Sequence, residues 1–244
     1  MGLNDCRDNS NQEALMDNPV VVVGGAGRVG RLVVQRLLER GAAVRVVDHA
    51  LQQARRHLPS EAGFTLGDVR DPADLAEPLA RCSAVVYCVD PGTADSGPDA
   101  PQSTVYQGLC NVLDAARAAG QRPHVVLISQ HHATHWGHPL NAYGRVLEWR
   151  LAGEEALRES GLPYTVIRPG WLTDGAAGLR VRLEQGDRGN GQVSRQDVAE
   201  ACVQALYCPS ASGVTFEMFN ETGVAPSQWE ELFAALEWDQ VPVA

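Results

Sequence analysis

Short apolar runs alternate with longer amphipathic stretches along most of the chain. The first run, residues 19–24 (PVVVVG), is rich in β-branched residues, as expected for a strand buried on both faces of a parallel sheet. Residues 28–40 then place apolar side chains at helical spacing, and Gly41 follows as a helix stop. The pattern therefore predicts a strand, a tight turn and a helix at the start of the folded region.

The same alternation continues to about residue 168. We expect further strands over 43–48, near Phe64, and over 84–89, 124–129 and 164–168, and helices over 72–81, 104–120 and 142–160. Strands that alternate with helices of about ten or more residues indicate βαβ units. The predicted fold class is therefore α/β, with a doubly wound parallel sheet of the Rossmann type.

The alternation of predicted strands and helices becomes less regular after Gly170. A glycine-rich polar segment over 185–193 predicts a loop, and the patterns that follow predict a helix over 195–207, a short strand over 214–219 and a last helix over 227–238. We expect residues 170–244 to form a small C-terminal cap on the substrate side. The predicted organisation is a disordered polar leader over 1–18, followed by a single α/β domain over 19–244.

Composition and charge limit the classes of partner that the protein is expected to bind. The formal net charge is −10 and no long basic run occurs, which argues against nucleic acid or an anionic membrane as the main partner. No apolar stretch approaches the ~20 residues that span a bilayer, and the leader lacks the apolar core of a secretory signal. We expect a cytoplasmic protein with a small-molecule substrate. A homodimer is possible, since nothing in the sequence favours or excludes it.

A glycine-rich turn joins the first strand to the first helix. It consists of Gly24, Gly25, Ala26, Gly27, Arg28, Val29 and Gly30. Glycines let the backbone approach a pyrophosphate closely, and the N-terminus of the following helix offers free N–H groups and partial positive charge. A strand before the turn and a helix after it are the context in which this motif predicts dinucleotide binding rather than a merely structural turn.

Asp48, at the end of the second strand, lies 18 residues after Gly30. A carboxylate here can accept hydrogen bonds from the adenosine ribose and repel a 2′-phosphate, which favours NAD over NADP. We place His49 beside it in the cofactor site. The alternative is a solvent-facing turn acid. Arg28, Arg55 or Arg56 could still bind a phosphate, so NADP remains open.

With these motifs in place, the chain resembles the short-chain dehydrogenase/reductase superfamily, in its atypical, NmrA-like NAD(P)-binding branch. The resemblance covers residues 19 to about 220. Besides the glycine turn it rests on three segments: 67–71 (GDVRD), 160–170 (SGLPYTVIRPG) and 193–199 (VSRQDVA). It implies cofactor contacts at the strand ends from Asp68, Val69, Cys88, Val89, Asp90, Pro169 and Gly170.

The catalytic pattern of that superfamily is incomplete here. Classical members place Tyr-x-x-x-Lys on the helix after the fifth strand, with tyrosine as the general acid/base and lysine on the nicotinamide ribose. The chain contains no lysine. Tyr143 is followed by Leu147 at the lysine position, while the alternative register pairs Val146 with Arg150. Arg150 is therefore a candidate for holding the ribose, and Tyr143 a candidate for the proton.

Two further groups are candidates for proton transfer. Ser129 ends the fifth strand, where the resemblance implies an active-site serine, although a helix cap is an equal alternative. The segment QHHATHWGH follows and contributes His131 and His132 as candidate acid/base groups, because imidazole titrates near neutral pH. The alternative is a solvent-exposed polar loop. No carboxylate lies within the segment, so we expect no metal site.

Three functions are compatible with these features. The first is an atypical NAD(P)-dependent oxidoreductase acting on a small, aromatic or polyketide-like molecule. The second is a non-redox enzyme on the same fold, a dehydratase, epimerase or cyclase, which the missing Tyr-Lys pair motivates. The third is a redox-inactive NAD(P)-sensing regulator. The oxidoreductase is the function we expect.

Overall fold

A computed structural model describes residues 18–91, 97 and 100–240 of the chain. The strands are β1 (Val20–Val23), β2 (Val44–Asp48), β3 (Gly63–Leu66), β4 (Ala84–Tyr87), β5 (His124–Ile128), β6 (Tyr164–Pro169), β7 (Trp171–Thr173), β8 (Leu179–Glu184), β9 (Gln192–Ser194) and β10 (Val214–Val224). The α-helices are α2 (Gly30–Glu39), α3 (Leu51–His57), α4 (Ala73–Leu79), α5 (Gly108–Ala118), α6 (Val146–Glu159), α7 (Arg195–Tyr207) and α8 (Trp229–Ala234). Three short helical segments complete the order: η1 (Gln102–Gln107), η2 (Pro139–Ala142) and η3 (Pro209–Ala211).

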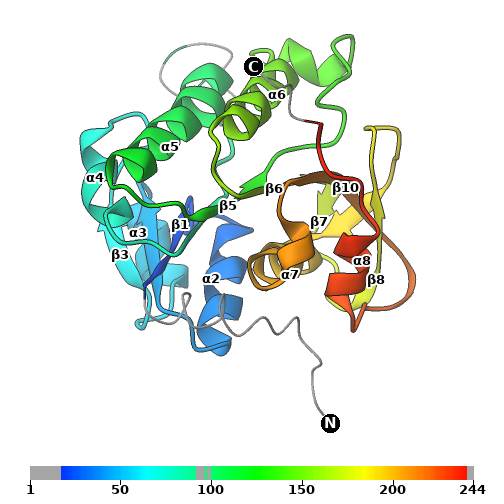
Figure 1. The fold of residues 1–244 in the computed structure, drawn as a ribbon, viewed down its shortest axis with the longest axis horizontal. Helices are drawn as coiled ribbons and strands as arrows, with labels where there is room; N and C mark the ends of the chain where they lie inside the picture. The colour runs from blue at the N-terminus through cyan, green and yellow to red at the C-terminus, as the bar shows by residue number, and fades with distance from the viewer. Residues whose placement is uncertain (1–17, 92–96, 98–99, 241–244) are drawn as a thin grey trace.

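Eight strands form one sheet in the order β3-β2-β1-β4-β5-β6-β10-β8. The strands from β3 to β10 pair in parallel, and β8 pairs antiparallel to β10 at the edge. Figure 1 shows α5 and α6 above this sheet and α2 and α7 below it. The strand order with helices on both faces is that of the Rossmann fold, so the predicted fold class is confirmed.

Each face of the sheet has its own apolar core, and β1 contributes to both. Val20 and Val22 pack with α2 and α7, whereas Val21 and Val23 pack with α4, α5 and α6. All four side chains are fully buried. This two-sided burial is the physical reason for the unbroken valine run that predicted the strand.

Several elements differ from the expectations. The predicted helix over 104–120 begins as the π-helix η1 and becomes the α-helix α5 only at Gly108. The predicted helix over 142–160 begins later, at Val146, because Gly144 and Arg145 both adopt left-handed backbone angles (φ 58° and 57°). Tyr143 is therefore not helical, and the expectation that it lies on the same helix as Arg150 was wrong.

The C-terminal third contains more strand than expected. β10 extends to Val224, and β7, β8 and β9 were missed, although β9 overlaps the end of the predicted loop over 185–193. The last helix is shorter than expected, covering Trp229–Ala234. The short helix α3 also escaped prediction. These strands are brief and are stabilised by partners distant in sequence, so local periodicity carried little signal for them.

The expected leader over 1–18 lies outside the described residues except for Asn18. Within the part of the chain that the structure describes, no helix has both the length and the apolar character needed to cross a membrane.

The packing of α6 provides a test of the fold. Leu157 is fully buried in the core under α5 and α6. Leu157→Ala should lower the free energy of unfolding by about 3 kcal/mol, since it removes buried methyl groups and leaves a cavity. Leu66→Ala is the matched control, because Leu66 is 58% exposed and its loss should change stability by less than about 0.5 kcal/mol. Equal effects in denaturant unfolding would contradict this packing.

Candidate functional site

The carboxyl ends of the parallel strands meet at one edge of the sheet and line a single long cleft. Its volume is about 920 Å³, which suits a dinucleotide together with a small molecule. The lining runs from the glycine turn, past the ends of β2 and β3, to the ends of β4, β5 and β6. Ligands of open α/β sheets bind at this edge.

The glycine turn forms the floor of the cleft at the end of β1. Gly24 has a left-handed backbone (φ 78°), and a Cβ there would lie 3.0 Å from the backbone of Cys88. Gly25 and Gly30 do not line the cleft: a Cβ on Gly25 would lie 2.7 Å from a Val46 methyl carbon, and one on Gly30 2.3 Å from the Gly24 carbonyl oxygen. Both are required by packing beneath the turn.

The turn leads directly into α2. The N–H groups of Arg31, Leu32 and Val33 donate to the turn carbonyl oxygens of Gly27 and Val29, whereas those of residues 28–30 make no hydrogen bond within the described residues. Ala26, Gly27, Arg28 and Val29 all line the cleft just before this helix. Glycine-lined backbone at a helix N-terminus fits a pyrophosphate. The turn therefore fits the phosphates of a dinucleotide by its shape and by its free donors.

Asp48 connects β2 to the turn. Its carboxylate oxygens accept hydrogen bonds from the backbone N–H of Ala26 (2.9 Å) and of Ala50 (2.8 Å), and the side chain is buried. The interpretation of Asp48 as a solvent-facing acid is therefore wrong. A carboxylate oxygen accepts more than one hydrogen bond, so the group also remains available to a ligand hydroxyl. His49 beside it lines the cleft and is largely exposed.

The arginines considered as phosphate ligands differ in position. Arg28 lines the cleft and forms an ion pair with Asp174. Arg55 and Arg56 lie near the C-terminal end of α3 and do not line the cleft. Arg31, in the first turn of α2, lines it although the sequence analysis had not selected it.

The segment after β3 lines the part of the cleft where the family resemblance implies cofactor contacts. Asp68 and Val69 both line the cleft. The Asp68 carboxylate accepts hydrogen bonds from Arg70, which hold the pKa of Asp68 below its ordinary value. Asn111 on α5 donates to the Val69 carbonyl oxygen (2.9 Å) and fixes this wall from behind.

At the other end of the cleft, Arg150 projects from α6. It is buried and donates to the Asp90 carboxylate (2.6 Å) and to the Ile128 carbonyl oxygen (3.3 Å). Its buried Nε has no hydrogen-bond partner within the described residues. Cys88, Val89, Pro169 and Gly170 line the same end as predicted, so the candidate cofactor residues here come together.

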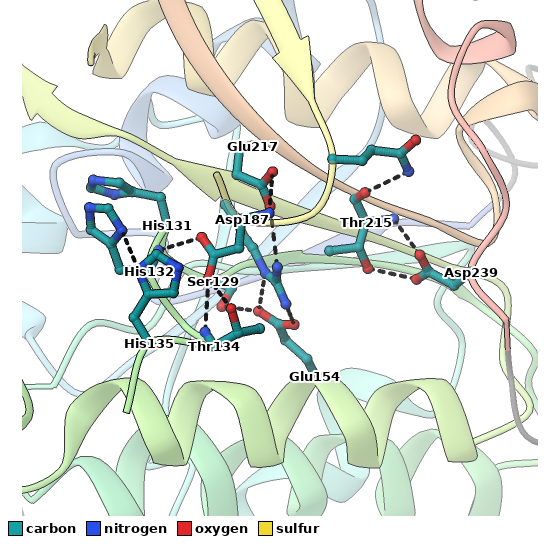
Figure 2. A network of polar contacts seen from close by, with 12 residues as sticks. Ser129, His131, His132, Thr134, His135, Glu154, Asp187, Thr215, Glu217 and Asp239 are labelled. Atoms are coloured by element: carbon teal, nitrogen blue, oxygen red, sulfur yellow. Dashed lines mark hydrogen bonds and ion pairs between the residues drawn. The ribbon is translucent and has the colours of Figure 1, made fainter. Parts of the chain in front are cut away.

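Ser129 lines the cleft just beyond β5, and its hydroxyl group has a buried partner. The hydroxyl donates to Glu154 Oε1 at 2.6 Å (Figure 2). Glu154 is fully buried on α6 and accepts hydrogen bonds from Arg168 Nε (2.9 Å) and Nη2 (2.6 Å). The serine is therefore fixed by an ion pair behind it rather than by a helix cap.

The same network continues into the C-terminal third. Arg168 also pairs with the buried Glu217 on β10 (3.2 Å), and Glu217 accepts a hydrogen bond from the backbone N–H of Asp187 (3.0 Å). Burial raises the pKa of Glu217, with Arg168 opposing the shift. Burial lowers the pKa of Arg168 while Glu154 raises it, and the net shift is upward, so the arginine stays charged.

Asp187 connects this network to the histidine segment (Figure 2). Its carboxylate accepts hydrogen bonds from the backbone N–H groups of His132 (2.6 Å) and Thr134 (2.8 Å) and from the Thr134 hydroxyl (2.8 Å). Burial would raise the pKa of Asp187, but these donors outweigh it and hold the pKa below its ordinary value. Asp187 therefore holds the segment at His132 and Thr134, while residues 134–137 are exposed, as the alternative of a solvent-exposed polar loop expects.

His131 lies inside the cleft wall. It is 1% exposed, its Nδ1 lies 3.1 Å from the Pro169 carbonyl oxygen, and its Nε2 is buried without a partner in the described residues. A ring nitrogen next to a carbonyl oxygen carries the hydrogen, so Nε2 is an acceptor. Burial lowers the pKa of His131 to about 4.

Two of the candidate catalytic residues lie outside the cleft lining. Tyr143 is 58% exposed in the turn between η2 and α6. His132 packs against His135 and His138, with its ring centroid 4.6 Å from that of His138, rather than lining the cleft. Within the described residues, no group of three or more His, Cys, Asp or Glu residues is arranged to hold a metal ion.

Sequence patterns did not indicate the buried carboxylates of Glu154, Asp187 and Glu217. Glu154 stands one helical turn after Arg150, a spacing that could have suggested a shared face. Asp187 and Glu217 lie in a loop and on a strand with no local signal for their roles. Trp171 and Leu172, 45% and 36% exposed, line the cleft beside His131.

The protonation of His131 is testable by imidazole NMR. The folded chain should keep His131 neutral, with its hydrogen on Nδ1, down to about pH 5, since burial disfavours the cation. The unfolded chain binds that proton near ~6.5, so acidification from that pH towards about 4 should lower the free energy of unfolding. A titration midpoint near 6.5 in the folded protein would contradict the described burial.

The role of Asp187 is testable by stability. Asp187→Asn replaces an acceptor oxygen by a donor facing the Thr134 N–H and hydroxyl groups. The free energy of unfolding should fall by about 1–3 kcal/mol, and the His132 and Thr134 amide resonances should shift. Asp114→Asn is the control, because the Asp114 side chain is 73% exposed on α5. The assignment fails if both variants behave alike.

Comparison with known proteins agrees with this geometry. Residues 24–209 match the family model described as NAD(P)H-binding. An uncharacterized chloroplastic protein of Arabidopsis thaliana is 31% identical over 244 residues, covering 88% of this chain and 74% of that protein. Sanguinarine reductase of Eschscholzia californica is 27% identical over 259 residues, covering 88% of this chain and 94% of that enzyme.

The fold is shared with solved structures. A putative NAD-dependent epimerase/dehydratase from Bacillus halodurans superposes with a TM-score of 0.75 at 22% identity, covering 90% of this chain and all of that chain. The family model spans the glycine turn, the ends of β2 to β6 and the start of the C-terminal third, which are the parts that build the cleft. The chain belongs to the NAD(P)H-binding family.

Proposed function

We propose that the protein is an NAD(P)H-dependent reductase of a small aromatic molecule. The observation that carries the proposal is the continuity of the cleft. It joins the glycine turn and Asp48 to Ser129, His131 and the exposed indole of Trp171 without a break in its lining. The length and lining at one end suit a dinucleotide, and the apolar wall at the other end suits a flat molecule beside it.

The residues present fit the cofactor on structural grounds. The glycines at 24, 25 and 30 leave no room for side chains. Arg150 and His131 line the cleft, and each has a buried side-chain nitrogen without a hydrogen-bond partner in the described residues. Arg150 would hold ribose hydroxyls with a permanent positive charge, as lysine does in classical members. The bound dinucleotide would supply a hydride.

The chain's own residues position the acceptor rather than activate it. Ser129 is fixed by Glu154, and His131 by the Pro169 carbonyl oxygen. Trp171 and Leu172 offer an apolar face that excludes water on one side of the acceptor. The name of the 27% identical relative, sanguinarine reductase, supports a reductase function.

For the cofactor we propose NAD. The buried Asp48 carboxylate is fixed by two backbone donors and cannot turn away from a ribose in the cleft. A 2′-phosphate near this carboxylate would meet like charge, whereas a ribose hydroxyl would gain an acceptor.

The binding preference gives the test. Fluorescence titration should show NADH binding about tenfold more tightly than NADPH, and Asp48→Asn should remove most of that difference, because it removes the charge but keeps one acceptor oxygen. Asp114→Asn should leave both affinities unchanged. The complex should oxidise NADH in the presence of menadione, 9,10-phenanthrenequinone or 9-fluorenone. Binding of neither dinucleotide would refute the proposed function, and equal binding of both would refute the NAD preference.

A further inference from the structure

A short segment of the C-terminal third reaches the glycine turn from the other side of the cleft. It covers residues 171–178, which we call the strap, and it begins with β7, which pairs with β9 rather than with the main sheet. Trp171 and Leu172 line the cleft, whereas residues 174–178 are exposed. The strap therefore has one part inside the cleft and one part at its mouth.

The start of α7, one of the segments that carry the family resemblance, holds both ends of the strap. Arg195 Nη1 donates to the Leu172 carbonyl oxygen (3.4 Å) and to Asp174 Oδ1 (3.0 Å). The buried Asp197 carboxylate accepts a hydrogen bond from the Gly178 N–H (3.0 Å). The position of the strap is therefore set by α7.

Asp174 joins the strap to the glycine turn. Its Oδ2 forms an ion pair with Nη2 of Arg28 in the turn, while its Oδ1 pairs with Arg195. Both arginines line the cleft. Two guanidinium groups, one from the first turn of the chain and one from the C-terminal third, thus contact the same carboxylate.

This arrangement leaves a surplus of positive charge and of hydrogen-bond donors. Two guanidinium groups share one Asp174 carboxylate, so the three side chains together carry a single net positive charge. Within the described residues, Nε and Nη1 of Arg28 and Nε and Nη2 of Arg195 make no hydrogen bond. Such a pair favours an anion whose oxygens accept several hydrogen bonds.

The neighbouring backbone indicates which anion fits. The N–H groups of residues 28–30 make no hydrogen bond within the part of the chain that the structure describes, and they lie at the start of α2. A glycine turn with such donors fits a pyrophosphate. Arg28 belongs to this turn, so the two arginines lie where the pyrophosphate of a dinucleotide fits, and its two negative charges exceed their surplus.

We propose that Arg28 and Arg195 form a clasp on the pyrophosphate of the bound dinucleotide, with Asp174 as the spacer that offsets their mutual repulsion. Arg195 thereby becomes a cofactor-binding residue contributed by the C-terminal third. Its side chain is only 14% exposed and is already held by the strap, so little conformational entropy is lost when it contacts a phosphate. The inference requires dinucleotide binding but no hydride transfer, and it therefore stands apart from the reductase proposal.

Variants of Arg195 test the clasp by binding alone. In fluorescence titration, Arg195→Gln should bind NADH about tenfold more weakly, because it loses a charge-assisted contact. The loss of affinity between about 50 and 500 mM NaCl should also become smaller, since one charge fewer is screened. Arg195→Lys should restore the salt dependence but only part of the affinity, because lysine lacks the planar fork. Arg180→Gln is the control: it removes the same charge from a 67% exposed side chain outside the cleft lining and should change neither quantity.

Asp174→Asn distinguishes a clasp from a tether. If Arg195 acted only by holding the strap through Asp174, both Arg195→Gln and Asp174→Asn would weaken NADH binding. In the clasp, Asp174→Asn removes a charge of the same sign as the pyrophosphate and keeps both guanidinium groups, so NADH should bind about threefold more tightly. Weaker binding of NADH by Asp174→Asn would overturn the proposal.

ADP-ribose identifies the part of the cofactor that the clasp holds. It contains the pyrophosphate but no nicotinamide, so Arg195→Gln should lower its affinity by the same factor as that of NADH. A loss for NADH alone would place the effect at the nicotinamide end and refute the clasp, as would unchanged affinities for both ligands. Binding of NADH without its oxidation by any acceptor would refute only the reductase. Thermal unfolding shows whether each variant is folded, and if Arg195→Gln is not, Arg195→Lys and the sign of the Asp174→Asn effect still decide.

Discussion

The ion pair between Glu154 and Arg168 is the interaction on which the acceptor end of the site depends. Both side chains are buried, and two short hydrogen bonds join them between α6 and β6. Burying charge is costly unless each charge is paired and its remaining hydrogen bonds are satisfied. Here Ser129 and Arg158 donate further hydrogen bonds to the Glu154 carboxylate, and Glu217 accepts a hydrogen bond from Arg168. The network therefore tolerates few alternative arrangements, and the groups attached to it are held in place.

That rigidity explains how a chain without the Tyr-Lys pair still presents an ordered site. In place of a lysine, Arg150 extends from α6 toward Asp90 and the end of β5. In place of a mobile loop, the histidine segment is fixed through Asp187, which Glu217 in turn holds. The same network engages the Ser129 hydroxyl with Glu154, while His131 Nδ1 faces the Pro169 carbonyl oxygen. Stability and site geometry are linked here, because the contacts that satisfy the buried charges also hold Ser129 and the histidine segment in place.

The cofactor end of the cleft is not held by a buried ion pair of this kind. It depends on backbone shape, since the glycines at 24, 25 and 30 are each required by a close approach to neighbouring atoms. Asp48 then fixes the turn against β2 by accepting a hydrogen bond from the Ala26 N–H. Local sequence encodes this end almost completely, because a strand, a turn and a helix N-terminus lie within a dozen residues. The acceptor end joins segments about ninety residues apart, from Ser129 to Glu217.

Apart from the short helix α3, the sequence by itself determined the order of strands and helices through residue 168, the glycine turn and Asp48, because each is carried by local periodicity or by a short motif. It could not place Tyr143, since two consecutive left-handed residues delay the start of α6 and leave the phenol in solvent. Nor could it show what holds the histidine segment, because Asp187 acts from 53 to 55 residues away. Only the tertiary structure decided which polar groups are buried together, and burial sets both the charge state of His131 and the direction of the Ser129 hydrogen bond.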